Sequence, residues 1–279
     1  MDYIELDIKI TPRIPAGDIL MTELAESGFE SFDETKEGLK AYIVAENFTE
    51  QALQPLTGWD QQLAQITYTR RTIPAQNWNS VWESQFEPVL VAGRCRIRAP
   101  FHEPDHGVEF DLLIEPRMSF GTGHHETTSL MVEKLLTMEL AGKTLMDMGC
   151  GTGVLGILAL RLGAAAAQGV DVEENAVENA RENASRNNVD FPVEKGDQRL
   201  LEGRNFEVIL ANINKNVLLQ SISRYAEALS EAGALAISGF FVTDEDELIA
   251  AAQASGLHIK DRNSRNNWSM LYFEKTRGV

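Results

Sequence analysis

The sequence predicts an α/β protein in which a large, doubly wound and mainly parallel sheet follows a small α+β domain. From residue 143 onward, strand-like runs alternate with helical segments, as in parallel sheets covered by helices on both faces. A glycine-rich turn joins the first of these strands to its helix. The first 75 residues follow a different order, and 279 residues with 43% apolar composition are enough for two separate cores.

The N-terminal residues 1–73 are predicted to form a ferredoxin-like domain. Residues 3–10 alternate as a strand with one buried face does, and residues 15–27 carry Leu20 and Leu24 at helical spacing after a proline. Further strands are expected at 29–33, 39–45 and 65–71, and a short helix at 49–56. The order β-α-β-β-α-β is that of the ferredoxin-like fold. This part shows no catalytic constellation, so we expect it to recognise a substrate or to give structural support.

Residues 74–92 are predicted to connect the two domains. Trp78, Trp82 and Phe86 recur every four residues, which places three rings on one face of a helix. Such a stripe is typical of a packing face, and we assign it no chemistry. Short strands are expected at 94–114, before the main sheet of the domain that spans 93–279.

The net charge of −17 indicates which partners the surface favours. Such a surface repels nucleic-acid phosphate and anionic membranes and attracts basic molecules. Residues 1–75 hold 13 acidic and 6 basic residues, a net of −7, which leaves −10 for the rest. We therefore expect a basic protein partner and no direct contact with nucleic acid, although solubility alone also explains such a charge. A monomer is the default expectation.

The sequence shows no signal for export, membrane insertion or disulfide formation. The opening residues lack a basic start followed by a long apolar run. No stretch approaches the roughly 20 apolar residues that span a bilayer. Cys95 and Cys150 are far apart and form no CxxC pair. We therefore expect a cytoplasmic protein with reduced thiols and no membrane contact.

The strongest local signal is the run DMGCGTG, residues 147–153, between a strand and a helix. Glycines at 149, 151 and 153 allow a tight turn and a close approach of a ligand to the backbone at the helix N-terminus. The spacing also approximates an NAD-type fingerprint. Dinucleotide turns, however, have no need of a carboxylate such as Asp147 before the first glycine. A carboxylate there suits the ammonium group of a sulfonium cofactor.

Polar residues follow the next strands. Asp171 ends the second strand, where its oxygens are placed to accept hydrogen bonds from both ribose hydroxyls of an adenosine. Asp197 follows the third strand and is suitable for contact with adenine. Asn212, in ANIN after the fourth strand, gives the amide and the carbonyls expected of an amine methyltransferase, although Asn is also a common helix cap.

In this order and spacing, FGTGHHETT (120–128), DMGCGTG, GVDVEENA and ANI resemble the ribosomal protein methyltransferase family called PrmA. The resemblance covers nearly the whole chain, and FGTGxHxTT is its specific part. It implies a Rossmann-like, seven-stranded class I methyltransferase domain that uses S-adenosylmethionine. The implied substrate is the large-subunit ribosomal protein numbered eleven, methylated on lysine and N-terminal amines.

The resemblance also implies site residues. The family's cofactor contacts fall on Thr128, Gly149, Asp171 and Asn212. We add as cofactor-binding residues Asp147, Gly151, Gly153, Asp197, Phe120 and His125, and we expect Asn212 to be catalytic. Arg117 stands where the family usually has glycine, which puts the conformation of that turn in question.

No metal site is expected, because His124 and His125 are adjacent and share no helix or strand face. We expect His125 to shape the loop over the cofactor rather than to remove a proton. One alternative is a methyltransferase of this fold that acts on another protein amine or amide. Enzymes that modify the release-factor glutamine carry NPPY in place of ANIN, which counts against them here. An NAD-dependent oxidoreductase is another alternative, and it leaves FGTGHHETT and ANIN unexplained.

Overall fold

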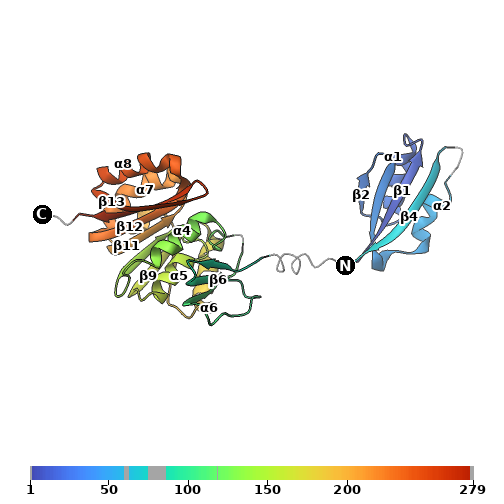
Figure 1. Cartoon of the computed structure of the whole chain (residues 1–279). Coiled ribbons are helices and arrows are strands. Elements are labelled where there is room, and N and C mark those ends of the chain that lie inside the picture. The colour runs from blue at the N-terminus through green and yellow to red at the C-terminus, as the bar shows by residue number, and fades with distance from the viewer. Residues whose placement is uncertain (1, 60–62, 75–85, 118, 277–279) are drawn as a thin grey trace. The chain divides into compact units, whose positions relative to one another are not determined.

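The computed structural model describes residues 2–59, 63–74, 86–117 and 119–276, and the chain divides into two compact units, Met1–Gln85 and Phe86–Val279. Figure 1 shows the elements of both units. The boundary falls within the stretch expected to connect two domains. The helix predicted there, with Trp78 and Trp82, lies outside the described residues.

In its described residues, the first unit is a four-stranded antiparallel sheet with two α-helices. Its elements are β1 (Tyr3–Thr11), α1 (Ala16–Glu26), β2 (Ser31–Glu34), β3 (Gly38–Val44), α2 (Gln54–Thr57) and β4 (Gln65–Ile73). The strand order β2-β3-β1-β4, with every ladder antiparallel, is the ferredoxin-like arrangement. Leu6, Ile8 and Ile10 of β1 face a core that includes Leu20 and Leu24 of α1, so the alternation predicted from sequence is the buried face of the sheet.

The second unit begins with a small three-stranded sheet and continues into a seven-stranded one (Figure 1). The small sheet holds β5 (Val89–Val91), β6 (Cys95–Arg98) and β7 (Phe110–Leu113). The elements that follow are α4 (Glu126–Leu135), β8 (Thr144–Met148), α5 (Val154–Arg161), β9 (Ala166–Asp171), α6 (Glu174–Arg186), β10 (Val193–Lys195), β11 (Phe206–Asn212), α7 (Lys215–Ala228), β12 (Leu229–Phe241), α8 (Glu245–Ala254), β13 (Leu257–Arg265) and β14 (Trp268–Lys275).

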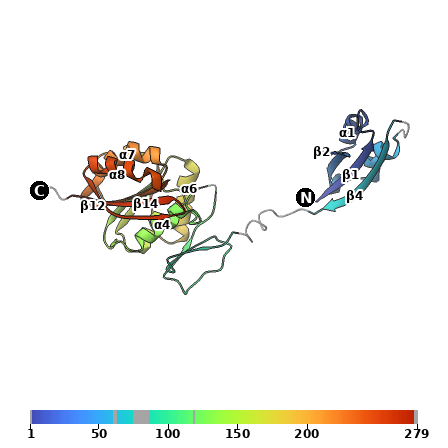
Figure 2. The same ribbon diagram turned by 45° about the horizontal axis from the view of Figure 1, so that its top comes forward.

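The large sheet is doubly wound, as predicted. Its order is β10-β9-β8-β11-β12-β14-β13, with parallel ladders from β10 to β12 and antiparallel ladders at β14 and β13. One apolar core joins the sheet to α4, α5 and α6, and the other joins it to α7 and α8. Figure 2 shows α7 and α8 on one side of β14 and α4 on the other. The chain winds one way from β8 to β10 and the other way from β11 onward. The C-terminal edge between β8 and β11 is therefore the topological switch point, where ligands bind in such sheets.

The strands at the C-terminus were not located from the sequence. β13 is mostly exposed and polar after Ile259, so it lacks the apolar alternation that predicts a strand. Asn266 and Asn267 form the hairpin turn with positive φ, a conformation that Asn tolerates. Another helix, α4, begins inside the run FGTGHHETT, which the sequence suggested only as a loop.

Phe191 explains why glycines recur around α5. A Cβ atom on Gly156 would lie 2.2 Å from the Phe191 ring, and one on Gly169 would lie 2.7 Å from it. The ring thus fills space that side chains would otherwise occupy between α5 and β9. Gly153 is also close to this ring, and its left-handed φ of 79° places it at the N-cap of α5.

We expect Gly156→Ala to destabilise the second unit by about 1–3 kcal/mol, because Phe191 must move from a closely packed site. The measurement is thermal and urea unfolding. Gly17→Ala is the matched control, since a Cβ there meets its nearest atom at 3.6 Å with no positive φ. Equal stability of both variants would contradict the packing argument.

Candidate functional site

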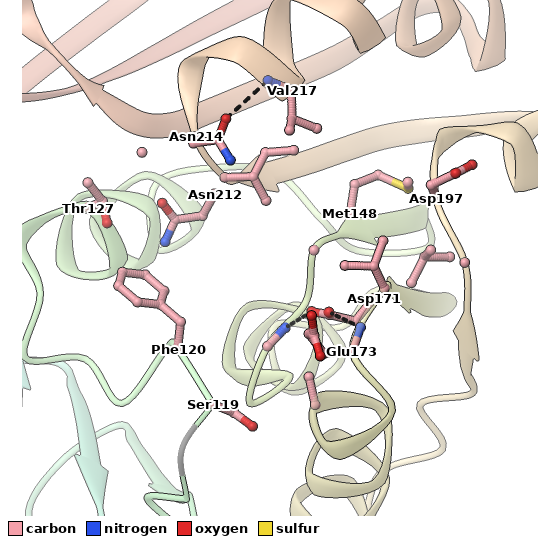
Figure 3. A pocket seen from close by; sticks show the side chains of 18 of the residues that line it. Ser119, Phe120, Thr127, Met148, Asp171, Glu173, Asp197, Asn212, Asn214 and Val217 are labelled. Carbon is pink, nitrogen blue, oxygen red and sulfur yellow. Dashed lines mark hydrogen bonds between the residues drawn. The ribbon is translucent and has the colours of Figure 1, made fainter.

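A cavity of about 920 Å³ lies along the edge where the parallel strands end. The residues that line it at or just after these strand ends are Asp197 for β10, Asp171 for β9, Gly149 for β8, Asn212 for β11 and Gly239 for β12. Figure 3 shows the acidic Asp171, Glu173 and Asp197 on one side, and Phe120, Thr127 and Asn212 on the other. The cavity therefore runs across the switch point from an acidic end to an aromatic and amide end.

The glycine turn after β8 is packed directly against the loop that carries Phe120. Gly149 and Gly151 have positive φ. A Cβ on Gly151 would lie 2.3 Å from the Phe120 carbonyl oxygen, and one on Gly149 would lie 2.3 Å from Ile213 Cγ2. Thr152 N–H donates to the Phe120 carbonyl at 2.9 Å, and Thr152 Oγ1 donates to the Gly121 carbonyl at 2.7 Å. These glycines are thus needed for protein packing as well as for ligand approach.

Asp171 ties the glycine turn to the start of α6. Its Oδ2 accepts a hydrogen bond from Gly151 N–H at 2.9 Å, and its Oδ1 accepts one from Glu173 N–H at 3.0 Å. Each carboxylate oxygen has further lone pairs, so both can also accept hydrogen bonds from a ligand in the cavity. The two backbone bonds fix the orientation of the carboxylate in advance.

Asp197, which follows β10, is the N-cap of the short 3₁₀ helix Gln198–Leu201. Its carboxylate accepts hydrogen bonds from Arg199 N–H and Arg199 Nε, both at 2.9 Å. The hydrogen bond from the Arg199 side chain holds the pKa of the Asp197 carboxyl below its usual value. Asp197 is therefore a fixed, ionised group at the β10 end of the cavity.

Asn212 has one satisfied and one unsatisfied side-chain atom. Its Nδ2 donates to Thr128 Oγ1 at 3.3 Å, while its Oδ1 is buried and has no hydrogen-bond partner. The alternative interpretation of Asn212 as a helix cap is wrong, because Asn214 caps α7 by accepting from Val217 N–H at 3.2 Å. A buried acceptor without a partner is costly in a folded protein and marks a position where a ligand can supply the donor.

His125 is held at the start of α4. It is the N-cap of α4, and its Nδ1 accepts from Thr127 N–H at 3.3 Å. Its ring lies 5.1 Å from that of Phe120 and 4.6 Å from that of Trp268, centroid to centroid. The imidazole is thus held by the helix terminus and by two aromatic neighbours along the cavity wall.

The neighbouring His124 and the distant His102 fasten the start of this unit. His102 Nδ1 accepts from Ala99 N–H at 3.1 Å, so its Nε2 carries the proton and donates to the Phe86 carbonyl at 2.6 Å. His124 Nε2 donates to the Glu87 carbonyl at 2.9 Å. The two histidines therefore hold the chain where it enters the unit beside the loop of His125.

Three predicted cofactor residues, Thr128, Asp147 and Gly153, do not line the cavity. Thr128 is buried and positions Asn212, whereas Gly153 caps α5. Asp147 Oδ2 accepts from Gly156 N–H at 3.1 Å, and its Oδ1 has no partner. Burial raises the pKa of the Asp147 carboxyl to about 7. Its contact with a cofactor stays a prediction.

Arg117 adopts no left-handed conformation, since the described non-glycine residues with positive φ are others. Its guanidinium binds both oxygens of Glu182 on α6, at 3.0 and 2.7 Å. The residue thus forms a side-chain contact at the cavity edge that glycine does not have. The local turn does not require a glycine at this position.

Several residues that line the cavity were not predicted from the sequence. They include Met148, Val172, Asn214, Val217, Tyr225, Gly239 and Trp268. Trp268 was missed because the strand that it begins was not predicted. Among the described residues, no group of three or more His, Cys, Asp or Glu side chains is arranged to hold a metal ion. In the same part of the chain, no helix has the length and apolarity to cross a membrane.

We expect the stability of the ligand-free protein to decrease between about pH 4 and 7 because of Asp147. The folded-state pKa lies above the unfolded one, so the stabilisation from the neutral carboxyl is complete below the unfolded pKa and is lost as the pH rises through about 7. The free energy of unfolding of Asp147→Asn should lack this decrease, which is on the order of a few kcal/mol. Urea unfolding of both proteins at pH 5 and 8 makes the measurement, and parallel changes would refute the assignment.

The family described as ribosomal protein L11 methyltransferase (PrmA) matches residues 18–276. The chain is 41% identical to the ribosomal protein L11 methyltransferase of Porphyromonas gingivalis over 98% of both chains. It is 38% identical to that of Bacteroides fragilis over 98% of this chain and 99% of the relative. A crystal structure of ribosomal protein L11 methylase from Lactobacillus delbrueckii subsp. bulgaricus shares the fold, with a TM-score of 0.64 and 23% identity, covering 69% of this chain and 100% of that one. The chain belongs to the ribosomal protein L11 methyltransferase family.

Proposed function

We propose that this protein transfers methyl groups from S-adenosylmethionine to lysine and N-terminal amines of ribosomal protein L11. Relatives named ribosomal protein L11 methyltransferase match this chain over nearly the whole length of both proteins, which supports the reaction. The observation that carries the chemistry is the buried, unpartnered Asn212 Oδ1 at a strand end in the cavity. This acceptor has no donor within the protein and belongs to a residue that lines the cavity, which supports its use by a substrate amine.

The residues of the acidic end fit the adenosine part of the cofactor. Asp171 presents preoriented oxygens to two ribose hydroxyls, and Asp197 lies one strand further, at the position expected for adenine. The backbone of Gly149 leaves room for the amino-acid part near β8. A cavity of about 920 Å³ is also of the size that takes a ligand of this class. The cofactor supplies a methyl group already activated by its sulfonium.

The protein's own task is to align a neutral amine and to exclude water. Asn212 Oδ1 accepts one hydrogen of the amine, and a carbonyl of the following loop accepts another, so that the nitrogen lone pair faces the methyl carbon. Thr128 fixes the amide by accepting from Nδ2, which leaves Oδ1 as the free acceptor. A lysine amine, with a reference pKa of about 10.4, loses its proton on entry because burial beside a cation disfavours its charged form.

We propose that residues 1–73 recognise the substrate and that the second unit carries out the transfer. This unit begins at Phe86 and includes β5, so it starts earlier than the expected boundary at residue 93. The net acidity of the first 75 residues supports attraction of a basic protein. We also propose that the protein is cytoplasmic and monomeric and that it does not contact nucleic acid directly.

The experiment that tests the function is incubation with radiolabelled S-adenosylmethionine and ribosomal proteins from cells that lack this enzyme. Electrophoresis and mass spectrometry identify the labelled band. Label on L11 is the expected result. Label on another protein would keep the reaction and reject the substrate, whereas no cofactor binding would reject both.

Replacing Asn212 with Ala should lower kcat about 100-fold or more at saturating cofactor, because the amine loses the acceptor that orients its lone pair. The matched control is Asn205→Ala, because Asn205 is exposed and does not line the cavity, so its kcat should equal that of the wild type. Single-turnover methylation of L11 is the measurement. Unchanged turnover of Asn212→Ala would remove this residue from the mechanism.

Residues 1–73 alone should bind L11, and their binding should weaken as salt is raised, because the acidic surface attracts a basic partner. Calorimetry at low and high ionic strength gives the affinity, and residues 86–279, which form the second unit, serve as the comparison. A fragment that folds, by its circular dichroism, yet binds no L11 would argue against the recognition role.

A further inference from the structure

The residue that begins β14 lies beside the acceptor end of the cavity because of the sheet's topology. β14 is antiparallel to β12, so it starts at the same edge where the parallel strands end. In the register, Asn212 pairs with Ser238 of β12, and Phe241 at the end of β12 pairs with Trp268. Trp268 thus extends the line of strand-end residues beyond Asn212, away from Asp171.

Trp268 belongs to a row of four aromatic rings, defined here as Phe120, His125, Trp268 and Phe241. Successive centroids are 5.1, 4.6 and 4.2 Å apart. The first three line the cavity, whereas Phe241 packs on the outer side of Trp268. Phe120 is 50% exposed and Phe241 is 46% exposed. A continuous run of partly exposed rings at a cavity mouth is typical of a binding surface rather than of scattered apolar residues.

The hairpin turn that precedes Trp268 is anchored on both sides. Asn266 Nδ2, at the tip of the hairpin, donates to Glu126 Oε1 at 3.0 Å. Val242 N–H donates to the Asn267 carbonyl at 2.9 Å. These bonds tie the β13–β14 turn to the first turn of α4 and to the segment after β12. The backbone that carries Trp268 is therefore held in place, and its ring packs between those of His125 and Phe241.

Charge separates the two ends of the cavity. The carboxylates among the described lining residues are Asp171, Glu173, Glu178 and Asp197, all from β9, α6 or the turn after β10. The lining residues near Asn212 and Trp268 carry rings, amides and aliphatic groups instead. An amine at this end thus meets aromatic faces and one amide oxygen without a carboxylate that would hold it as a paired ammonium.

The end of the cavity with Asn212 and Trp268 suits an amine whose N–H hydrogens are replaced in turn by methyl groups. During transfer the acceptor nitrogen forms the new N–C bond with its lone pair, while the S–C bond breaks and sulfur keeps that electron pair. The proton lost from nitrogen goes to water. Each transfer thus replaces an N–H, which needs an acceptor, by a methyl group, which needs apolar or aromatic contact.

We propose that Trp268 is the residue that determines amine specificity, because its indole contacts the alkyl groups on the acceptor nitrogen and lets the enzyme rebind an amine that already carries methyl groups. The inference rests on the proposed function. It names an aromatic wall, backed by Phe241 and flanked by His125, as the surface that receives the substrate amine and its methylated forms.

The test compares the full-length wild type with Trp268→Ala, Trp268→Phe and the control Val242→Ala. Val242 is 43% exposed and close to the hairpin turn, but it does not line the cavity. Three quantities are measured for each protein: the Kd for S-adenosylhomocysteine by calorimetry, KM for L11, and the number of methyl groups per amine by mass spectrometry.

For Trp268→Ala we expect KM for L11 to rise about tenfold and products to shift toward monomethylated amines, because the cation–π and apolar contacts are lost. The Kd for S-adenosylhomocysteine should stay within about twofold of the wild type, since only the acceptor end changes. Trp268→Phe should restore most of the pattern, and Val242→Ala should match the wild type.

A wild-type methyl pattern and KM in Trp268→Ala would overturn the proposal. Loss of S-adenosylhomocysteine binding in Trp268→Phe would also overturn it, because Trp268 would then support the cofactor end or the fold. If the wild type itself leaves L11 unlabelled, the proposed function fails, and this inference fails with it.

Discussion

The parallel pairing of β8 with β11 determines how the other strands of the large sheet in the second unit are arranged. Val208 pairs with Leu145 and Ala211 with Met148, so two strands distant in sequence become central neighbours. Every other strand of the seven-stranded sheet is added outward from this pair. Because the chain turns away in opposite directions after β8 and β11, the loops at their ends separate and leave space between them. The acidic and aromatic ends of the cavity follow from that single reversal.

A second constraint joins this space to the loop before α4. The Phe120 carbonyl occupies the position that a Cβ on Gly151 would take, and it accepts a hydrogen bond from Thr152. The signatures FGTGHHETT and DMGCGTG, though about 25 residues apart in the chain, are therefore two halves of one packed arrangement. Substitution in one half disturbs the other, because the contact is made by backbone atoms that cannot be repacked.

The sequence predicted those features that depend on local periodicity and on strand-end chemistry. The alternation of β1, the strands around Asp171 and Asn212, and the doubly wound order all follow from patterns within about ten residues. Thr128, Asp147 and Gly153 were predicted as cofactor contacts and do not line the cavity, because their side chains or φ angles serve Asn212 or α5. Side-chain direction within a turn depends on tertiary contacts that spacing does not encode.

The largest omission was the hairpin of β13 and β14, and the reason is physical. Its outer strand is an edge with mostly exposed polar residues, so nothing in the pattern distinguishes it from a loop. Pairing with β12 decides its structure, and that pairing is non-local. A residue at the cavity such as Trp268 could therefore not be assigned from sequence periodicity alone.

The two histidines that hold the start of the second unit act on backbone carbonyls, those of Phe86 and Glu87. The Phe86 side chain adds contacts of its own, because its ring centroid lies 4.4 Å from that of His124 and 6.3 Å from that of His102. The start of the second unit is therefore held against the loop before α4 by contacts that lie within this unit. The wall of the cavity that carries His125 thus depends on residues 86 and 87, which lie far from it in the sequence.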